Sequence, residues 1–146
     1  MDIQINSHQE IPGLKSQKIK RKLERVLKDL ACHDKELSIL LTDDYHITKL
    51  NERYLGKAGP TNVLAFPMSG GPLPEIESPM LGDVVISLET ARRESVSMDE
   101  PFEKTLDRLL IHGILHLLGY DHETSQKQAK CMEQQEKRLM SLITEE

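Results

Sequence analysis

The stretch HGILHLLGYDH, residues 112–122, is central to this chain because it carries histidines at positions 112, 116 and 122 and a glycine at position 119. If the stretch begins in a helix, His112 and His116 lie one turn apart on one face, so both imidazoles can bind one metal ion. Gly119 tolerates the left-handed conformation that ends a helix, and the chain can then turn to bring in His122. Three neutral nitrogens leave a fourth coordination position open, which is typical of a catalytic zinc site.

The spacing HxxxHxxGxxH is the ligand pattern of the metzincin zinc peptidases, but Gly113 stands where those enzymes carry a glutamate. Because that glutamate takes a proton from the zinc-bound water, its absence disfavours peptide hydrolysis. A zinc ion can still lower the pKa of bound water from ~15.7 to ~7 and polarise a phosphoryl oxygen, so phosphodiester hydrolysis stays open. An additional proton relay would have to come from one of three acidic residues, Asp83, Asp121 or Glu123.

Two alternatives concern the metal itself. Cys131, on the following predicted helix, could complete a closed His3Cys site without catalytic activity, although closed zinc sites usually contain more thiolates. Nickel or cobalt could bind the same nitrogens in place of zinc. His8, His33 and His46 have no partner at ligand spacing, and we interpret them as surface residues.

Length and composition favour one domain over residues 1–146, because a chain of this size can bury a sufficient core. No apolar run is long enough to span a bilayer, and the first residues lack the features of a secretory signal. We therefore expect a cytoplasmic protein without a membrane partner. Cys32 and Cys131 are too few for a disulfide framework, which favours reduced thiols.

The net charge of −5 is unevenly distributed, since residues 1–57 contain 11 Lys or Arg against 9 Asp or Glu. A polyanion should therefore bind this first part of the chain. The candidate RNA contacts are Lys20, Arg21 and Arg25 in a predicted helix, with Arg53 and Lys57 further along. The polar face of that helix is basic throughout, with Lys15, Lys18, Lys20, Arg21, Lys22, Arg25 and Lys28, and such a face is also ordinary for a solvated helix.

Hydrophobic periodicity predicts the following elements: a strand around Ile3 and Ile5, a helix over 16–31, a strand over 36–42, a helix over 45–55, strands over 63–66 and 81–87, and helices over 88–96, 101–118 and 125–142. The predicted caps are Ser16, Asp43 or Asp44, Ser87, and a capping box of Ser97 with Glu100. This order predicts an α+β fold, a small mixed four-stranded sheet packed with helices around a central, buried metal-binding helix.

Three segments resemble the YbeY family of bacterial metal-dependent endoribonucleases, in the family's order and approximate spacing: LNERYLGKAGPTNVLAFP at 50–67, LGDVVIS at 81–87 and HGILHLLGYDHE at 112–123. The resemblance implies a zincin-like fold, with zinc held by His112, His116 and His122, and with His112 assigned to the catalytic centre. It also implies cleavage of single-stranded RNA. The family is linked to maturation of the 3′ end of small-subunit ribosomal RNA and to ribosome quality control.

One position departs from the family pattern, which usually reads YRGK where residues 54–57 read YLGK. The family's arginine, expected to contact substrate, is therefore Leu55 here. Arg53 lies nearly on the opposite helix face, and Lys57 follows the helix end without offering a guanidinium fork. Together with Cys131, this departure motivates a second hypothesis. The chain would be a non-catalytic module that binds the small ribosomal subunit, and its metal would have a structural role. A metzincin-like peptidase is a third.

Overall fold

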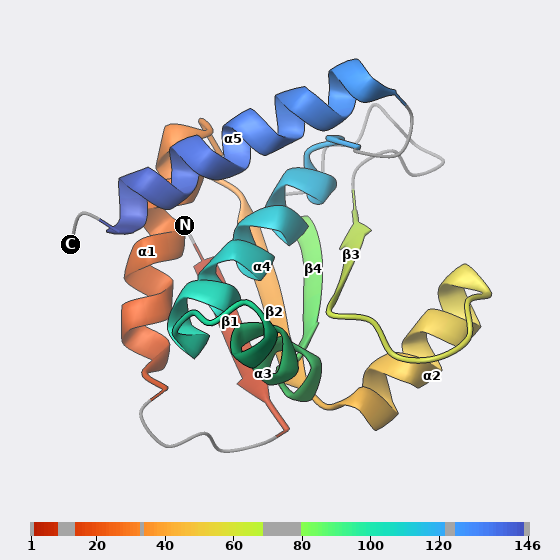
Figure 1. Ribbon diagram of the computed structural model, residues 1–146. Coiled ribbons are helices and arrows are strands. Elements are labelled where there is room, and N and C mark those ends of the chain that lie inside the picture. Colours follow the sequence, from red (N-terminus) through yellow and green to blue (C-terminus); the bar gives the residue numbers. More distant parts are fainter. Residues whose placement is uncertain (1, 9–13, 33, 69–79, 122–124, 145–146) are drawn as a thin grey trace.

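The computed structural model describes residues 2–8, 14–32, 34–68, 80–121 and 125–144. Each predicted strand and helix is confirmed in it, with ends that differ by no more than two residues from those predicted. The elements are, in chain order (Figure 1), β1 (Asp2–Ser7), α1 (Ser16–Asp29), β2 (Glu36–Thr42), α2 (Asp44–Leu55), β3 (Val63–Pro67), β4 (Met80–Ser87), α3 (Leu88–Ser97), α4 (Phe102–Leu117) and α5 (Gln126–Thr144).

The four strands form one mixed sheet in the order β1-β2-β4-β3. Strands β1, β2 and β4 are parallel, whereas β3 pairs antiparallel with β4 along one edge. The run Ile39–Leu41 lies in β2, which has a neighbour on each side, and this explains why its apolar residues are continuous rather than alternating. The predicted α+β class with a small mixed sheet is confirmed, while the zincin-like detail and the single domain over 1–146 stay predictions.

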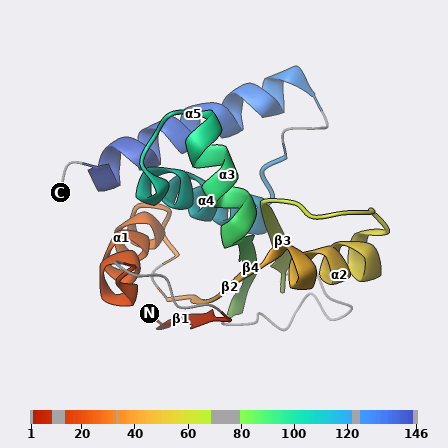
Figure 2. The same cartoon turned by 60° about the horizontal axis from the view of Figure 1, so that its bottom comes forward.

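Helices cover the two faces of the sheet unequally. Four helices, α1, α3, α4 and α5, gather on one face, and α2 covers the other (Figures 1 and 2). The start of α2 still reaches α3, where Asp44 pairs with Arg93 at 2.7 Å. In the larger core, Val84 and Ile86 of β4 pack with the apolar side of α4, whose Ile114 is fully buried. In the smaller core, Ile47 of α2 packs with Leu64 and Val85. The prediction that the histidine-bearing helix is central and buried is therefore confirmed.

Two of the predicted helix caps are wrong. Ser16 is already the first residue of α1, and the capping position belongs to Lys15, whose side chain makes no capping hydrogen bond. Ser97 still belongs to α3, so it cannot cap α4, which begins after Pro101. The Glu100 carboxylate instead accepts hydrogen bonds from the Thr105 hydroxyl at 2.7 Å and the Arg108 guanidinium at 2.6 Å.

The other predicted caps are confirmed by their hydrogen bonds. The Asp43 carboxylate accepts from the backbone N–H of His46 at 2.9 Å, and the Ser87 hydroxyl accepts from that of Thr90 at 3.2 Å. Each bond satisfies one of the N–H groups that the first turn of a helix leaves without a partner. The starts of α2 and α3 are thus set by local sequence.

Lys22 was expected on the polar face of α1, and this expectation is wrong. Its side chain is buried between α1 and α4, where the ammonium group lies 2.8 Å from a carboxylate oxygen of Asp107 and 2.7 Å from one of Glu103. The Asp107 side chain is buried as well. Paired charges are the form in which such groups are tolerated in a core, so this ion pair joins α1 to the central helix.

Candidate metal centre and adjoining pocket

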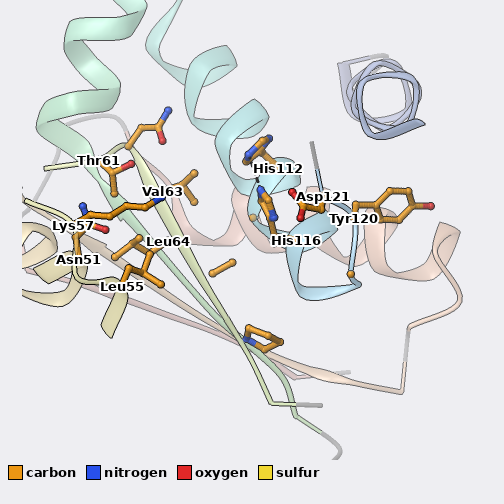
Figure 3. Close-up of a pocket in the computed structure, with 15 residues that line it drawn as sticks. Asn51, Leu55, Lys57, Thr61, Val63, Leu64, His112, His116, Tyr120 and Asp121 are labelled. Carbon is orange, nitrogen blue, oxygen red and sulfur yellow. Dashed lines mark hydrogen bonds between the residues drawn. The ribbon is translucent and has the colours of Figure 1, made fainter. Parts of the chain in front are cut away.

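Helix α4 places His112 and His116 side by side at the surface of the larger core. Their Nε2 atoms face each other at 3.1 Å, and the ring centroids are 4.6 Å apart (Figure 3). Two nitrogens bound at about 2.0–2.1 Å to one tetrahedral ion would be separated by about 3.3 Å. The spacing in this structure therefore fits two ligands of one zinc-sized ion.

The end of α4 turns the chain in the manner that its glycine predicts. Gly119 has a φ of +94°, and its backbone N–H donates to the carbonyl oxygen of His116 at 3.0 Å. The N–H of Tyr120 donates to the carbonyl oxygen of Leu115, also at 3.0 Å, which completes a Schellman motif. The reversal brings Asp121 to the wall of the same pocket as the two histidines.

The third predicted ligand, His122, and one relay candidate, Glu123, lie outside the described residues. Within the ranges that the structure covers, no three His, Cys, Asp or Glu side chains gather at one point that could hold a metal. The three-histidine site consequently stays a prediction, supported by the convergence of its first two members.

Glu136 of α5 is a site residue that sequence reasoning missed. One of its carboxylate oxygens, Oε1, is bonded to Nδ1 of His112, on the side of the imidazole away from His116. A signal was present in the sequence, because Glu136 lies at helical spacing within the stripe formed by Met132, Leu139 and Ile143, which are buried. A carboxylate in the middle of an apolar stripe indicates a polar partner on the facing element.

Gly113, the position of the missing metzincin glutamate, packs directly on the sheet. A Cβ atom there would lie 2.7 Å from Cγ1 of Val84 and 3.3 Å from Cγ2 of Val63. A side chain at this position would require Val84, Val63 or α4 itself to shift. A glutamate therefore does not fit at this position, and the peptidase interpretation loses its usual base for a steric reason.

A pocket of about 750 Å³ lies beside the histidines and is walled by the loop after α2, by β3 and by α4. Figure 3 shows Leu55 and Lys57 on the side away from His112 and His116. The lining residues are Asn51, Leu55, Lys57, Thr61, Asn62, Val63, Leu64, Ala65, Pro67, His112, Gly113, His116, Gly119, Tyr120 and Asp121.

The wall that carries Lys57 is held in place by Asn51, a buried residue in the last turns of α2. The Asn51 side-chain amide donates to the carbonyl oxygen of Gly59 at 3.1 Å, and the backbone carbonyl oxygen of Asn51 accepts from the N–H of Lys57 at 3.3 Å. Between Asn51 and Lys57, Gly56 ends α2 with a φ of +65°. These bonds fix the course of the loop that borders the histidines.

The other predicted RNA contacts do not line this pocket. Arg53 is exposed on α2, with its guanidinium carbon 5.4 Å from the centroid of the Tyr54 ring. Lys20, Arg21 and Arg25 belong to α1, which packs against α5 and β1. Of the five residues, the structure therefore brings only Lys57 to the histidines, and all five contacts stay predictions.

Two alternatives from the sequence become less favourable. Asp83 precedes Val84, which faces Gly113, so in the strand its side chain points to the opposite face of the sheet. Cys131 is exposed and lies five residues before Glu136, roughly 140° around the helix axis from it. Neither residue lines the pocket, which leaves Asp121 as the described relay candidate.

The sequence profile of the family described as Endoribonuclease YbeY matches residues 3–144. The chain belongs to the YbeY family. Proteins named Endoribonuclease YbeY include relatives from Syntrophus aciditrophicus, 38% identical over 98% of this chain and 90% of the relative, and from Syntrophotalea carbinolica, 41% identical over 99% and 97%. A third, from Persephonella marina, is 46% identical over 78% of this chain and 74% of the relative.

A solved structure has a fold similar to that of this chain. The solution structure of a Thermotoga maritima protein is similar to this chain with a TM-score of 0.65 and 27% identity, covering 97% of this chain and 88% of that one. The family resemblance seen in the sequence is confirmed by the profile match over residues 3–144. Among the described residues, no helix has both the length and the apolar character needed to cross a membrane.

Proposed function

We propose that this chain is a zinc-dependent endoribonuclease specific for single-stranded RNA. The observation that carries the proposal is the convergence of the His112 and His116 Nε2 atoms, 3.1 Å apart, at the wall of a pocket of about 750 Å³. Family membership supports RNA as the substrate, because the relatives are named endoribonucleases. The pocket volume lies within the range of about 300–1,000 Å³ that is usual for small-molecule sites, so it is suited to one segment of an unpaired strand.

The metal would be held by His112, His116 and, following the sequence pattern, His122. Nickel or cobalt would fit the same nitrogens, since imidazole ligands bind these metals as well as zinc, and the metal that occupies the site depends on availability. When bound, such an ion supplies a Lewis acid for a phosphoryl oxygen and lowers the pKa of a coordinated water. The two described histidines fit this role by their spacing and by the carboxylate that holds one of them.

The protein's own contribution to hydrolysis would come from the pocket walls. Lys57 can bind the phosphate of the strand as a point charge opposite the histidines. Asp121 lies in the same pocket and can accept a proton at its carboxylate from the attacking water, a role that Gly113 cannot fill. Phosphate binding by Lys57 and proton transfer to Asp121 would thus come from different segments of the chain.

The biological role that we propose follows the family resemblance: maturation of the 3′ end of small-subunit ribosomal RNA and ribosome quality control, with the small ribosomal subunit as partner in the cytoplasm. One observation favours a second candidate, a ribosome-associated module whose metal is structural. Leu55 lines the pocket where the family pattern expects an arginine, which removes a cation from the substrate wall.

Metal analysis and RNA cleavage test the proposed function together. Purified protein should contain about one zinc per chain and should cut a 5′-labelled single-stranded ribosomal RNA fragment, and His116→Ala should abolish the cutting. His46→Ala is the matched control, because His46 is exposed on α2 and does not line the pocket. Equal cleavage by wild type and His116→Ala would exclude the proposal. Zinc retention without any cleavage would favour the structural module, and turnover of peptides would revive the peptidase hypothesis.

A further inference from the structure

We propose that Glu136 is a positioning residue, which holds His112 in the orientation and tautomer needed for metal binding. The inference rests on the proposed metal site and extends it to α5, a helix outside the histidine motif. In this arrangement Glu136 fixes the orientation and tautomer of His112, and it does not itself bind the ion.

The hydrogen bond between the two side chains defines the tautomer. Oε1 of Glu136 is bonded to Nδ1 of His112, and an ionised carboxylate can only accept. The proton of a neutral imidazole therefore lies on Nδ1, so Nε2 presents its lone pair. That Nε2 atom is the one that faces Nε2 of His116 at 3.1 Å. The carboxylate thus directs the nitrogen lone pair toward the point where the two rings converge.

The position of Glu136 in α5 argues that the contact has a function beyond packing. Met132, Leu139 and Ile143 occupy the same stripe and are at most 2% exposed, whereas the Glu136 side chain is 20% exposed beside His112. A methionine or leucine in this stripe would continue the apolar contact of α5 with α4. A carboxylate costs desolvation there and adds a partner for one imidazole only.

A bond of this kind has a recognised effect on ligands. Carboxylates that accept from the second nitrogen of a metal-binding imidazole fix the ring and raise its basicity, and their loss typically weakens metal binding 10–100-fold. We therefore expect zinc affinity to depend on Glu136 even though this residue touches no metal in the proposed arrangement.

Substitution of Glu136 by methionine separates positioning from packing, because methionine suits the apolar stripe. In Glu136→Met, the zinc dissociation constant, measured by competition with a chromophoric chelator, should rise 10–100-fold. The visible spectrum of the cobalt-substituted protein should also change. The thermal midpoint of the metal-free protein should stay the same or increase. Glu136→Gln keeps an acceptor without the charge and should restore part of the affinity.

Glu133→Met is the matched control, since Glu133 is exposed on the same helix and pairs with Lys137 in a surface bridge of 3.2 Å. Its zinc affinity should stay within twofold of wild type. The inference is overturned if Glu136→Met binds zinc as tightly as wild type, or if both variants weaken binding equally. Zinc binding that depends on Glu136 in a protein without RNA cleavage would contradict the proposed function and leave this inference standing.

Discussion

Gly113 sets how closely the central helix approaches the sheet. Its missing Cβ would lie 2.7 Å from Cγ1 and 3.1 Å from Cγ2 of Val84. Gly113→Ala should lower the free energy of unfolding by about 1–2 kcal/mol, because overpacking of about 1–3 kcal/mol exceeds the gain of up to ~1 kcal/mol in helix propensity. Urea denaturation measures this difference.

A double-mutant cycle with Val84→Ala provides the control, since it removes the two atoms nearest to the added methyl group. The combined loss in Gly113→Ala/Val84→Ala should be smaller than the sum of the single losses. Strict additivity would show that the close approach of α4 to β4 is not what makes glycine necessary.

The buried pair of Lys22 and Asp107 gives a second prediction for single residues. Burial raises the pKa of the Asp107 carboxyl, whereas the pKa of Lys22 is raised because hydrogen bonds with Asp107 and Glu103 outweigh its desolvation. Nζ of Lys22 lies 2.8 Å from a carboxylate oxygen of Asp107, a distance typical of a charge-assisted hydrogen bond, so the two groups form an ion pair. Lys22→Met should therefore cost about 3 kcal/mol, because it leaves a buried carboxylate without its cation.

Replacing both partners tests this explanation. Lys22→Met/Asp107→Leu removes both charges from the interface of α1 and α4, and it should recover most of the stability lost in Lys22→Met. Chemical denaturation at neutral pH measures both variants. If the single variant is as stable as wild type, the ion pair does not hold the two helices together.

Among the elements, α2 carries Leu55, the position at which the family resemblance leads us to expect an arginine. Leu55 lines the pocket and is 51% exposed, so a longer side chain has room to extend. Leu55→Arg should increase affinity for single-stranded RNA several-fold, because a guanidinium can donate two hydrogen bonds to one phosphate. Fluorescence anisotropy at fixed salt measures the affinity. Leu55→Met is the control. An unchanged affinity in Leu55→Arg would show that this wall of the pocket does not take part in RNA binding.

The elements show which features the sequence could predict. The strands and helices follow from periodicity, and the pairing of His112 with His116 follows from a spacing of four residues in one helix. Contacts between different elements could not be predicted from periodicity or spacing. The contact of His112 with Glu136 and the burial of Lys22 depend on how α5 and α1 pack against α4. Periodicity predicts which face of a helix is buried, but it does not predict which element packs against that face.

Local rules also failed at helix starts, for a related reason. The cap of a helix depends on where the preceding chain enters the first turn, and that entry is fixed by tertiary packing. Lys15 has an extended conformation with a φ of −109°, so the turn begins one residue before the favourable Ser16. The pocket could not be predicted from the sequence either, because its walls come from three separate elements, α2, β3 and α4, whose packing local patterns do not define.

For the whole molecule, acid stability provides a prediction with a defined sign. Hydrogen bonds from Lys18 and Lys22 lower the pKa of Glu103 from 4.5 to about 2. Because the pKa is lower in the folded state, the ionised carboxylate stabilises the fold above pH ~4.5, and this contribution is lost as the pH falls toward ~2. The Glu103 side chain is 52% exposed, so solvent screening limits the effect to about 1 kcal/mol.

Glu103→Gln tests this window. The variant should be about 1 kcal/mol less stable than wild type at pH 6, and the difference should disappear near pH 2. Urea denaturation over this pH range provides both curves. A difference that stays constant down to pH 2 would show that the ionised form of Glu103 is not the source of the stabilisation.

The place of α4 late in the chain has a consequence for biosynthesis. A ribosome adds residues from the N-terminus at about 5–20 per second. All four strands therefore emerge before α4, the helix that covers the face of the sheet with the larger core. Until α4 follows, the apolar side chains of that face, such as Val84 and Ile86, lack their main cover. The pocket wall that carries Lys57 is also translated before the histidines, and Glu136 comes last of all. The nascent chain therefore depends on its final third both to bury the sheet and to complete the proposed metal centre.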